Sequence, residues 1–142
     1  MSQRVSCAAL ALSGCLALQA SGQEIHPIVL EGYNVPGIGN VPSGFSASEN
    51  LAVNNGGQWR VESDTDNADT NVDGVVVTGT AFAAPPLTLH LREGDPVAAP
   101  AGANIDSFDS ININNTGNSA YNLFLGNTGS TTTDSGVYFN ST

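Results

Sequence analysis

Residues that could hold a metal ion gather in one short acidic stretch. Residues 69–74 read Asp-Thr-Asn-Val-Asp-Gly, which matches the core pattern D-x-[DN]-x-[DN]-G of calcium-binding loops. Hard Ca²⁺ prefers about six to eight oxygen ligands, and alternate positions of a tight loop can direct several carboxylates and amides at one centre. The sequence therefore predicts a Ca²⁺ site whose ligands are Asp64, Asp66, Asp69, Asn71 and Asp73.

This loop differs from an EF-hand. The twelfth position counted from Asp69 is Thr80 and not a bidentate glutamate, and predicted strands flank the loop instead of helices. The aspartates of the loop repel one another, and the chain has no lysine to neutralise them, which favours a bound divalent cation. The alternative interpretation is a solvated loop between two strands that binds no ion.

No pattern of catalytic residues accompanies the acidic loop. The two histidines, His26 and His90, have no cysteine or glutamate at metal-ligand spacing, and no G-x-S-x-G motif occurs. Most carboxylates fall in one loop, whereas a glycosidase needs two that flank the scissile bond. We therefore expect a protein without enzymatic activity and without a cofactor other than Ca²⁺.

The N-terminus has the features of a secretory signal peptide. Arg4 precedes an apolar run, Val5 to Leu18, and the small residues at 20–22 suit a signal peptidase. The apolar run of about 14 residues is shorter than the ~20 that a membrane helix needs. We predict a signal helix in residues 1–22 that is cleaved after Ala20 or Gly22. The alternative is a lipoprotein anchored through Cys15, because residues 12–15 read Leu-Ser-Gly-Cys.

The charge of the chain restricts its partners. The full chain has a formal charge of −10, and loss of Arg4 with the signal makes the remainder more negative. Nucleic acid and anionic membranes are disfavoured, since binding phosphate requires a basic surface. A surface glycan or another protein remains as the expected class of partner. If the signal is cleaved after Ala20 or Gly22, both cysteines leave with it and no disulfide stabilises the secreted chain.

Hydrophobic residues alternate with polar ones along most of the remaining chain, which predicts an all-β fold. Asn-Asn-Gly-Gly at 54–57 and Asn-Asn-Thr-Gly at 114–117 are typical of hairpin turns, because asparagine and glycine accept positive φ. The predicted strands are residues 28–30, 51–53, 59–62, 75–78, 87–92, 111–113, 121–125 and 137–139.

The same pattern occurs twice. Glu31-Gly32 corresponds to Glu93-Gly94 at an offset of 62, and the two hairpin turns correspond at an offset of 60. We expect two tandem antiparallel units of about 60 residues, 23–86 and 87–142, each with four strands as in a propeller blade. The units would form a small sandwich, assemble with other copies, or belong to a longer array.

Three segments of the second unit resemble a repeat of secreted bacterial proteins, common in planctomycetes and other Gram-negative bacteria. They are Arg92–Pro96, Ser107–Gly117 and Asp134–Tyr138, which fit R-x-G-D-P, S-F-x-x-x-x-I-N-x-x-G and G-V-aromatic. The resemblance covers residues 28–140 in two copies and implies a propeller-like fold and secretion, but no activity. This chain departs from the pattern at Tyr33-Asn34, where the second unit has Asp95-Pro96.

These observations favour a secreted or surface-associated, non-enzymatic β-repeat protein with a structural or adhesive role. The alternative function is a carbohydrate-binding module or a fragment of a glycan-active extracellular protein, in which Trp59, Tyr121 and Phe124 would stack on sugars. Trp59 and Tyr121 lie in predicted hairpin strands, where aromatic residues normally fill a core. We therefore expect these two side chains to be buried.

Overall fold

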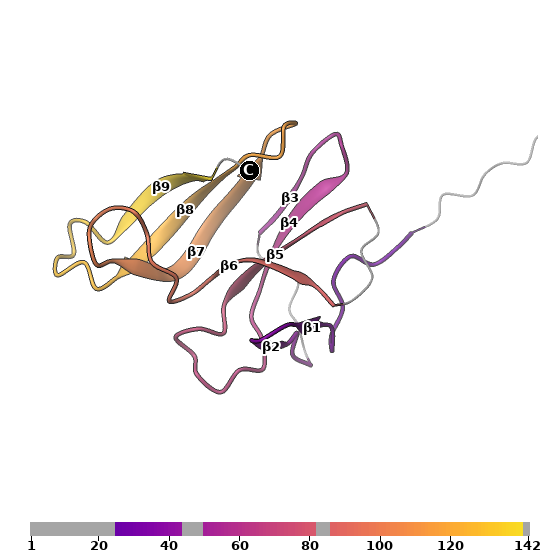
Figure 1. The fold of residues 1–142 in the computed structure, drawn as a ribbon, viewed down its shortest axis with the longest axis horizontal. Helices are drawn as coiled ribbons and strands as arrows, with labels where there is room; N and C mark the ends of the chain where they lie inside the picture. The colour runs from indigo at the N-terminus through magenta and orange to yellow at the C-terminus, as the bar shows by residue number, and fades with distance from the viewer. Residues whose placement is uncertain (1–24, 44–49, 82–85, 141–142) are drawn as a thin grey trace, which may run out of the picture.

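The protein is described by a computed structural model, which covers residues 25–43, 50–81 and 86–140. These residues form three small antiparallel sheets and no helix, so none of their segments is a helix able to cross a membrane (Figure 1). The predicted all-β fold is confirmed. The predicted signal helix lies outside the described residues.

The strands follow one another without long crossovers. The first sheet is a short hairpin, the second has the strand order β3-β4-β5-β6, and the third has the order β7-β8-β9. Their bounds are β1 Asn34–Val35, β2 Gly39–Asn40, β3 Leu51–Val53, β4 Gln58–Ser63, β5 Val75–Thr80, β6 Thr88–Arg92, β7 Asn104–Ile113, β8 Ser119–Gly126 and β9 Ser135–Asn140.

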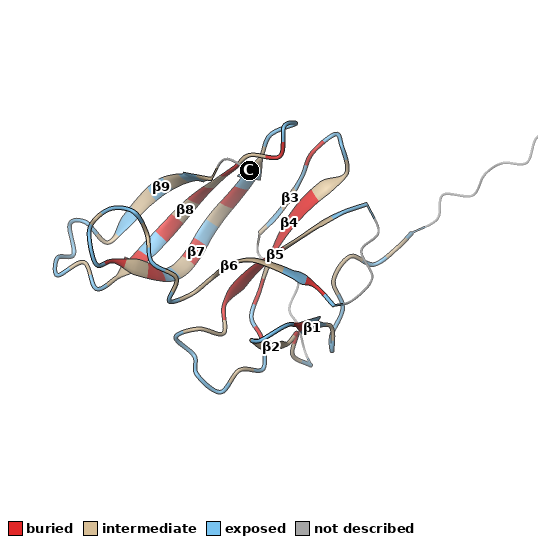
Figure 2. Ribbon diagram, in the orientation of Figure 1, coloured by how far each residue is buried: buried red, intermediate tan, exposed pale blue. Residues whose placement is uncertain are grey.

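The sheet β3–β6 lies in the middle and is covered on both faces (Figures 1 and 2). One face carries Trp59 and Val61 and packs on residues 28–41, including the β1–β2 hairpin. The opposite face carries Val76 and packs on the sheet β7–β9. Because both faces of β5 are covered, its residues Val75, Val76 and Val77 are all fully buried.

A β-bulge in β6 allows this strand to contribute to both cores. Leu89 pairs with Val77 and Leu91 pairs with Val76, so His90 is an extra residue in β6. Leu89 packs in the core beside the β1–β2 hairpin, and Leu91 packs in the core beside β7–β9. Without the bulge, strict alternation would place both leucines on the same face.

Two strand predictions and the placement of a third strand need correction. Residues 28–30 form no strand, although Ile28 and Val29 pack against the core. The strand predicted at 111–113 begins at Asn104, because two bulges in β7 make buried residues recur every third position. Residues 87–92, placed at the start of the second unit, pair with β5. The boundary predicted at 86/87 therefore does not separate the two larger sheets.

The two hairpin turns have the same hydrogen bonds. In each, the side-chain oxygen of the first asparagine, Asn54 or Asn114, accepts bonds of 3.0 Å from the backbone N–H groups two and four residues further on. The backbone oxygen of that asparagine accepts a bond from Gly57 or Gly117, and both glycines have positive φ. The turn predictions at 54–57 and 114–117 are confirmed.

Candidate functional site

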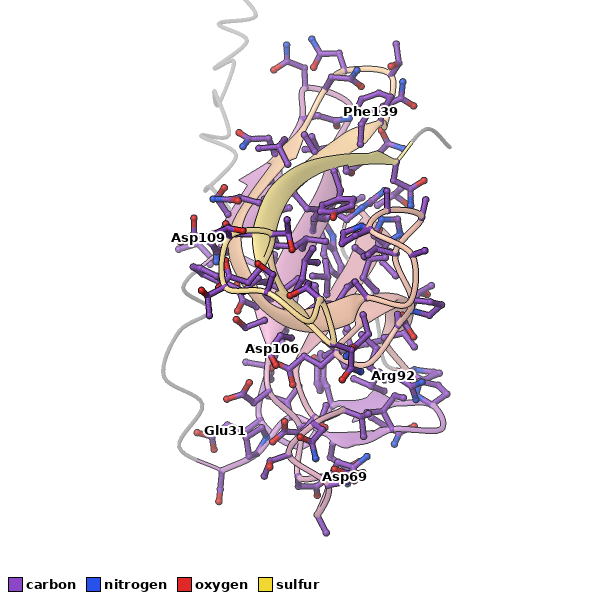
Figure 3. The ribbon with its side chains drawn as sticks, turned by 90° about the vertical axis from the view of Figure 1, so that its left-hand side faces the viewer. Glu31, Asp69, Arg92, Asp106, Asp109 and Phe139 are labelled. Carbon is purple, nitrogen blue, oxygen red and sulfur yellow. The ribbon has the colours of Figure 1, made fainter. Side chains whose placement is uncertain are left out.

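The acidic loop joins β4 to β5 at the end of the molecule marked by Asp69 in Figure 3. Asp69 accepts hydrogen bonds from the backbone N–H of Asn71 at 3.1 Å and from its side-chain amide at 2.8 Å. These bonds lower the pKa of Asp69 below its usual value. The side chains of Asp69 and Asn71 are therefore hydrogen-bonded to each other in a local turn on the surface.

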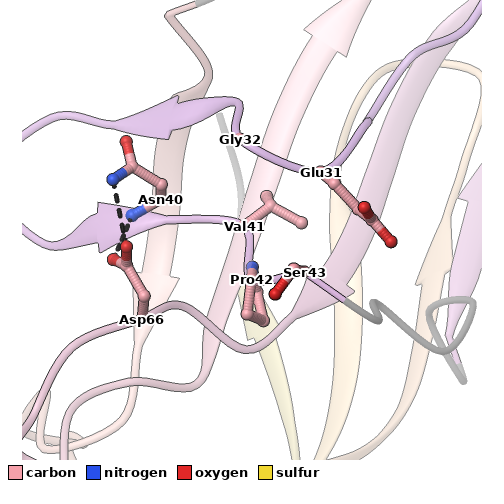
Figure 4. A pocket seen from close by; sticks show the side chains of 7 residues that line it. All are labelled: Glu31, Gly32, Asn40, Val41, Pro42, Ser43 and Asp66. Atoms are coloured by element: carbon pink, nitrogen blue, oxygen red, sulfur yellow. Dashed lines mark hydrogen bonds between the residues drawn. The ribbon is translucent and has the colours of Figure 1, made fainter.

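Asp66 points away from that turn toward the β1–β2 hairpin (Figure 4). Its carboxylate accepts hydrogen bonds from the backbone N–H of Asn40 at 2.6 Å and from the Asn40 side chain at 3.1 Å. The backbone N–H of Asp66 donates to the Asn40 oxygen at 2.8 Å. The bonds from Asn40 lower the pKa of Asp66. Asp66 thus attaches the acidic loop to the hairpin, beside an open cleft that Glu31 and Ser43 also line.

A third group of carboxylates lies at the base of the loop, around Glu93. This side chain follows β6, is half-buried, and accepts a hydrogen bond of 3.0 Å from the backbone N–H of Gly74. Burial, together with the charges of the neighbouring Asp73 and Asp64 carboxylates, raises the pKa of Glu93 to about 7, despite the opposing effect of the Gly74 hydrogen bond. Glu93 therefore titrates near neutral pH, far above an ordinary glutamate.

Glu93 was not among the residues predicted for the acidic site. It lies 19 residues from Gly74 in the chain, and only the pairing of β5 with β6 brings the two together. A side chain at position 74 would overlap the Glu93 carboxylate, which explains why a glycine suits this position. In the sequence, Glu93 stood out only as part of the repeated Glu-Gly pair.

The structure thus divides the five predicted Ca²⁺ ligands among three places. Asp69 and Asn71 form the surface turn, Asp66 contacts Asn40, and Asp64 and Asp73 lie near Glu93. Over the described residues, no three histidine, cysteine, aspartate or glutamate side chains are grouped closely enough to hold a metal ion. Ca²⁺ binding stays a prediction, and it requires the loop to draw these groups together.

A second polar cluster lies between the two larger sheets. Arg60 is buried and donates hydrogen bonds to the Trp59 oxygen at 3.1 Å, to the Thr78 hydroxyl, and to the Gly117 oxygen at 3.5 Å. The ring of His90 lies 5.8 Å from the ring of Tyr121. Burial, assisted by the charge of Arg60, lowers the pKa of His90 to about 4. His90 is therefore neutral at physiological pH.

The predicted core positions of Trp59 and Tyr121 are confirmed, since each side chain is only 2% exposed. The indole N–H of Trp59 donates to the Ala81 oxygen at 3.0 Å. A buried ring has no free face for a sugar, so these two residues cannot form the stacking platform of the alternative function. Of the three proposed aromatic residues, Phe124 is exposed, at 46%.

Comparisons of the chain with protein-family models, with curated proteins and with solved structures gave no match.

Proposed function

We propose that this chain is a secreted or cell-surface β-repeat protein whose two units stack like propeller blades and serve a structural or adhesive role. The observation that carries the proposal is the direct contact between equivalent turns. The Asn54 side chain donates to the Asn114 oxygen at 2.9 Å, and the Asn55 backbone N–H donates to the Asn115 side chain at 3.2 Å. Residues at an offset of 60 thus lie side by side.

The stacking has a consistent sense. In the first unit, Trp59 and Val61 face the β1–β2 hairpin. At an offset of 60, their counterparts in the second unit are Ser119 and Tyr121. These two residues face the first unit, on the side of it that lies away from the β1–β2 hairpin. The same face of each unit therefore packs toward the N-terminal neighbour, which is the arrangement of stacked repeats and of neighbouring propeller blades. Such proteins act through extended surfaces.

Ca²⁺ is the ion we propose for the acidic loop. The support is electrostatic: burial is the main cause that raises the pKa of Glu93 to about 7, and the negative charges of Asp73 and Asp64 add to the effect. A divalent cation would replace the proton that Glu93 binds and would relieve the repulsion. Its role would be to stiffen the link between loop 64–74 and the two sheets, not to support catalysis.

Cell fractionation tests the proposed location. The full chain with a C-terminal tag is expressed in a Gram-negative host, and the N-terminal residue of the product is identified by mass spectrometry. We expect an extracellular or surface product that begins at Ser21 or Gln23. A lipid-modified Cys15 would identify the anchored form, whereas a cytoplasmic product that retains residues 1–22 would contradict the proposal.

Bead adhesion tests the proposed role. Beads coated with residues 23–142 are compared with albumin-coated beads on bacterial cell walls and on glycan-coated surfaces. We expect retention of the coated beads on at least one surface. Equal retention of both kinds of bead on every surface would contradict an adhesive role.

Thermal unfolding at pH 8 tests the proposed ion. Millimolar Ca²⁺ should raise the melting temperature of the wild-type chain and should have a smaller effect on Glu93→Gln. Glu31→Gln is the matched control, because Glu31 is the repeat counterpart of Glu93 outside the acidic loop. An unchanged melting temperature in Ca²⁺, or an equal rise with Mg²⁺ in all three chains, would contradict a specific Ca²⁺ site.

A further inference from the structure

The two larger sheets differ at one edge. In the first unit, β5 pairs with β4 on one side and with β6 on the other. In the second unit, β9 pairs with β8 on one side, and no other described strand pairs with it. Figure 1 shows β9 at the outer margin of its sheet. The backbone groups along this margin resemble a template for a further strand.

The core beneath this edge is also incomplete. In the first unit, β6 and the residue before it bring Leu87 and Leu89 to the core that contains Trp59. At the corresponding face of the second unit there is an open cavity of about 350 Å³. Residues of β9, β8 and the segment after β6 line it, including Tyr138, Leu123 and Val97. The cavity therefore lies where aliphatic side chains of a fourth strand would pack.

The side chains of β9 do not protect the edge. The strand reads Ser-Gly-Val-Tyr-Phe-Asn and has no charge and no proline, the usual devices that prevent pairing at an edge. Val137 is 78% exposed and Phe139 is 67% exposed, and Figure 3 shows Phe139 at one end of the molecule. Tyr138 is held on the cavity side by a hydrogen bond of 2.6 Å from its hydroxyl to the Ala99 oxygen.

We propose that β9 is the acceptor edge for an extended peptide strand of a partner. The strand pairs antiparallel with β9, as β6 pairs with β5, and carries aliphatic side chains at alternate positions, as Leu87-Thr88-Leu89 does. Backbone hydrogen bonds supply the attachment, and the aliphatic side chains that fill the cavity supply the selectivity. This inference rests on strand pairing within the chain and not on its proposed location.

A second copy of the chain fits this edge less well. Paired through its own β9, it would offer Gly136 and Tyr138 on the cavity side, and neither supplies a free aliphatic side chain. Each copy also carries a formal charge of −10, so two copies repel each other at low ionic strength. A short uncharged or basic strand meets neither obstacle.

Adding a fourth strand to the sheet β7–β9 provides the first test. A flexible Gly-Ser linker followed by Leu-Thr-Leu-His-Leu-Arg, the sequence of residues 87–92, is appended after Thr142. The control extension replaces the first two leucines with aspartate. We expect the first extension to raise the melting temperature by about 4 °C or more over the control. Equal melting temperatures would overturn the proposal.

A separate peptide provides the second test. A fluorescent peptide with the sequence of residues 86–92 is titrated with the purified chain, and binding is followed by anisotropy. Phe139→Lys should weaken binding about tenfold or more, and Val53→Lys, at an exposed position of another strand, should leave it unchanged. Equal binding by both variants, or absence of binding by all chains, would overturn the proposal. A wild-type dimer that Phe139→Lys dissociates would assign the edge to a second copy instead.

Discussion

The sheets β3–β6 and β7–β9 each contain a hairpin with the same type of turn, but they differ in the segments that cover their faces. The turns at Asn54 and Asn114 have equivalent hydrogen bonds, yet the described residues cover the first sheet on both faces and the second on one. At an offset of 60, Trp59 and Arg60 of the first hairpin correspond to Ser119 and Ala120 of the second. The repeated part is thus the backbone of the turn, whereas the side chains are adapted to each neighbour.

The largest effect should come from the residue that differs most between the two hairpins. Trp59→Ala removes a buried indole that packs over Gly79, and we expect it to lower the free energy of unfolding by about 3–5 kcal/mol. The counterpart change, Ser119→Ala, should alter it by less than about 1 kcal/mol. Urea denaturation measures both. Comparable losses in the free energy of unfolding would contradict this expectation and would show that the two side chains contribute equally to stability.

Arg60 should come next, because it connects β4 to the turn between β7 and β8. Arg60→Ala removes the hydrogen bonds to Thr78 and Gly117 and leaves a void, so we expect a loss of about 2–3 kcal/mol in urea denaturation. Arg60→Met fills the space without a buried charge and should cost about 1 kcal/mol or less. If Met proved as damaging as Ala, the polar contacts of Arg60 and not its packing would hold the two larger sheets together.

The two asparagines allow a matched comparison. Asn54 is buried, and its side chain also donates a hydrogen bond to the second turn. Asn114 is exposed, and among the described residues its side chain makes hydrogen bonds only within its own turn. Asn54→Ala should therefore cost about 2 kcal/mol and Asn114→Ala about 1 kcal/mol. Thermal unfolding of both variants measures the difference. Equal losses would indicate that the contact between the turns contributes little.

The local chemistry of Asn and Gly made the hairpins predictable, whereas features that depend on distant contacts were not. The turn at 54–57 needs only an asparagine cap and a glycine with positive φ. The start of β7 was missed because bulges at Asp106 and Asp109 break the two-residue alternation. Ile28 and Val29 show the opposite case, since their apolar side chains reach the core without backbone pairing to a strand.

The register of β9 on β8 differs from that of β5 on β4. Sequence offsets match Gly136-Val137 to Gly74-Val75, which would place Val137 opposite Leu123. In the structure Gly136 pairs with Leu123, one residue away. A shift of one residue exchanges the two faces of a strand, so Val137 is exposed although Val75 is fully buried. Register depends on packing against β8, which a short motif does not encode.

The acidic site was predictable in place but not in arrangement. The spacing of aspartates located loop 64–74 correctly between two strands. It could not show that Asp66 turns to Asn40, or that Glu93 approaches Gly74 from another strand. Both contacts join residues far apart in the chain, and the bond from Asn40 occupies a carboxylate, that of Asp66, which the sequence prediction assigned to an ion.

The smallest effects should appear in the pH dependence, where the two regions oppose each other. Glu93 has a folded pKa of about 7 against 4.5 in an ordinary environment, so the folded state gains stability as pH falls from 7 to 4.5. His90 has a folded pKa of about 4 against 6.5, so the folded state loses stability as pH falls from 6.5 to 4. Both groups are partly exposed, and each contribution is on the order of 1 kcal/mol after screening.

Single substitutions should separate these opposing slopes. Glu93→Gln removes the contribution of the acidic loop, so its free energy of unfolding should fall on acidification between pH 6.5 and 4.5. His90→Gln removes the contribution of the inter-sheet cluster, so its free energy should rise over the same interval. The wild-type curve and that of the double variant should lie between the two. Parallel curves for both single variants would show that neither group has the environment that its contacts with Gly74 and Tyr121 imply.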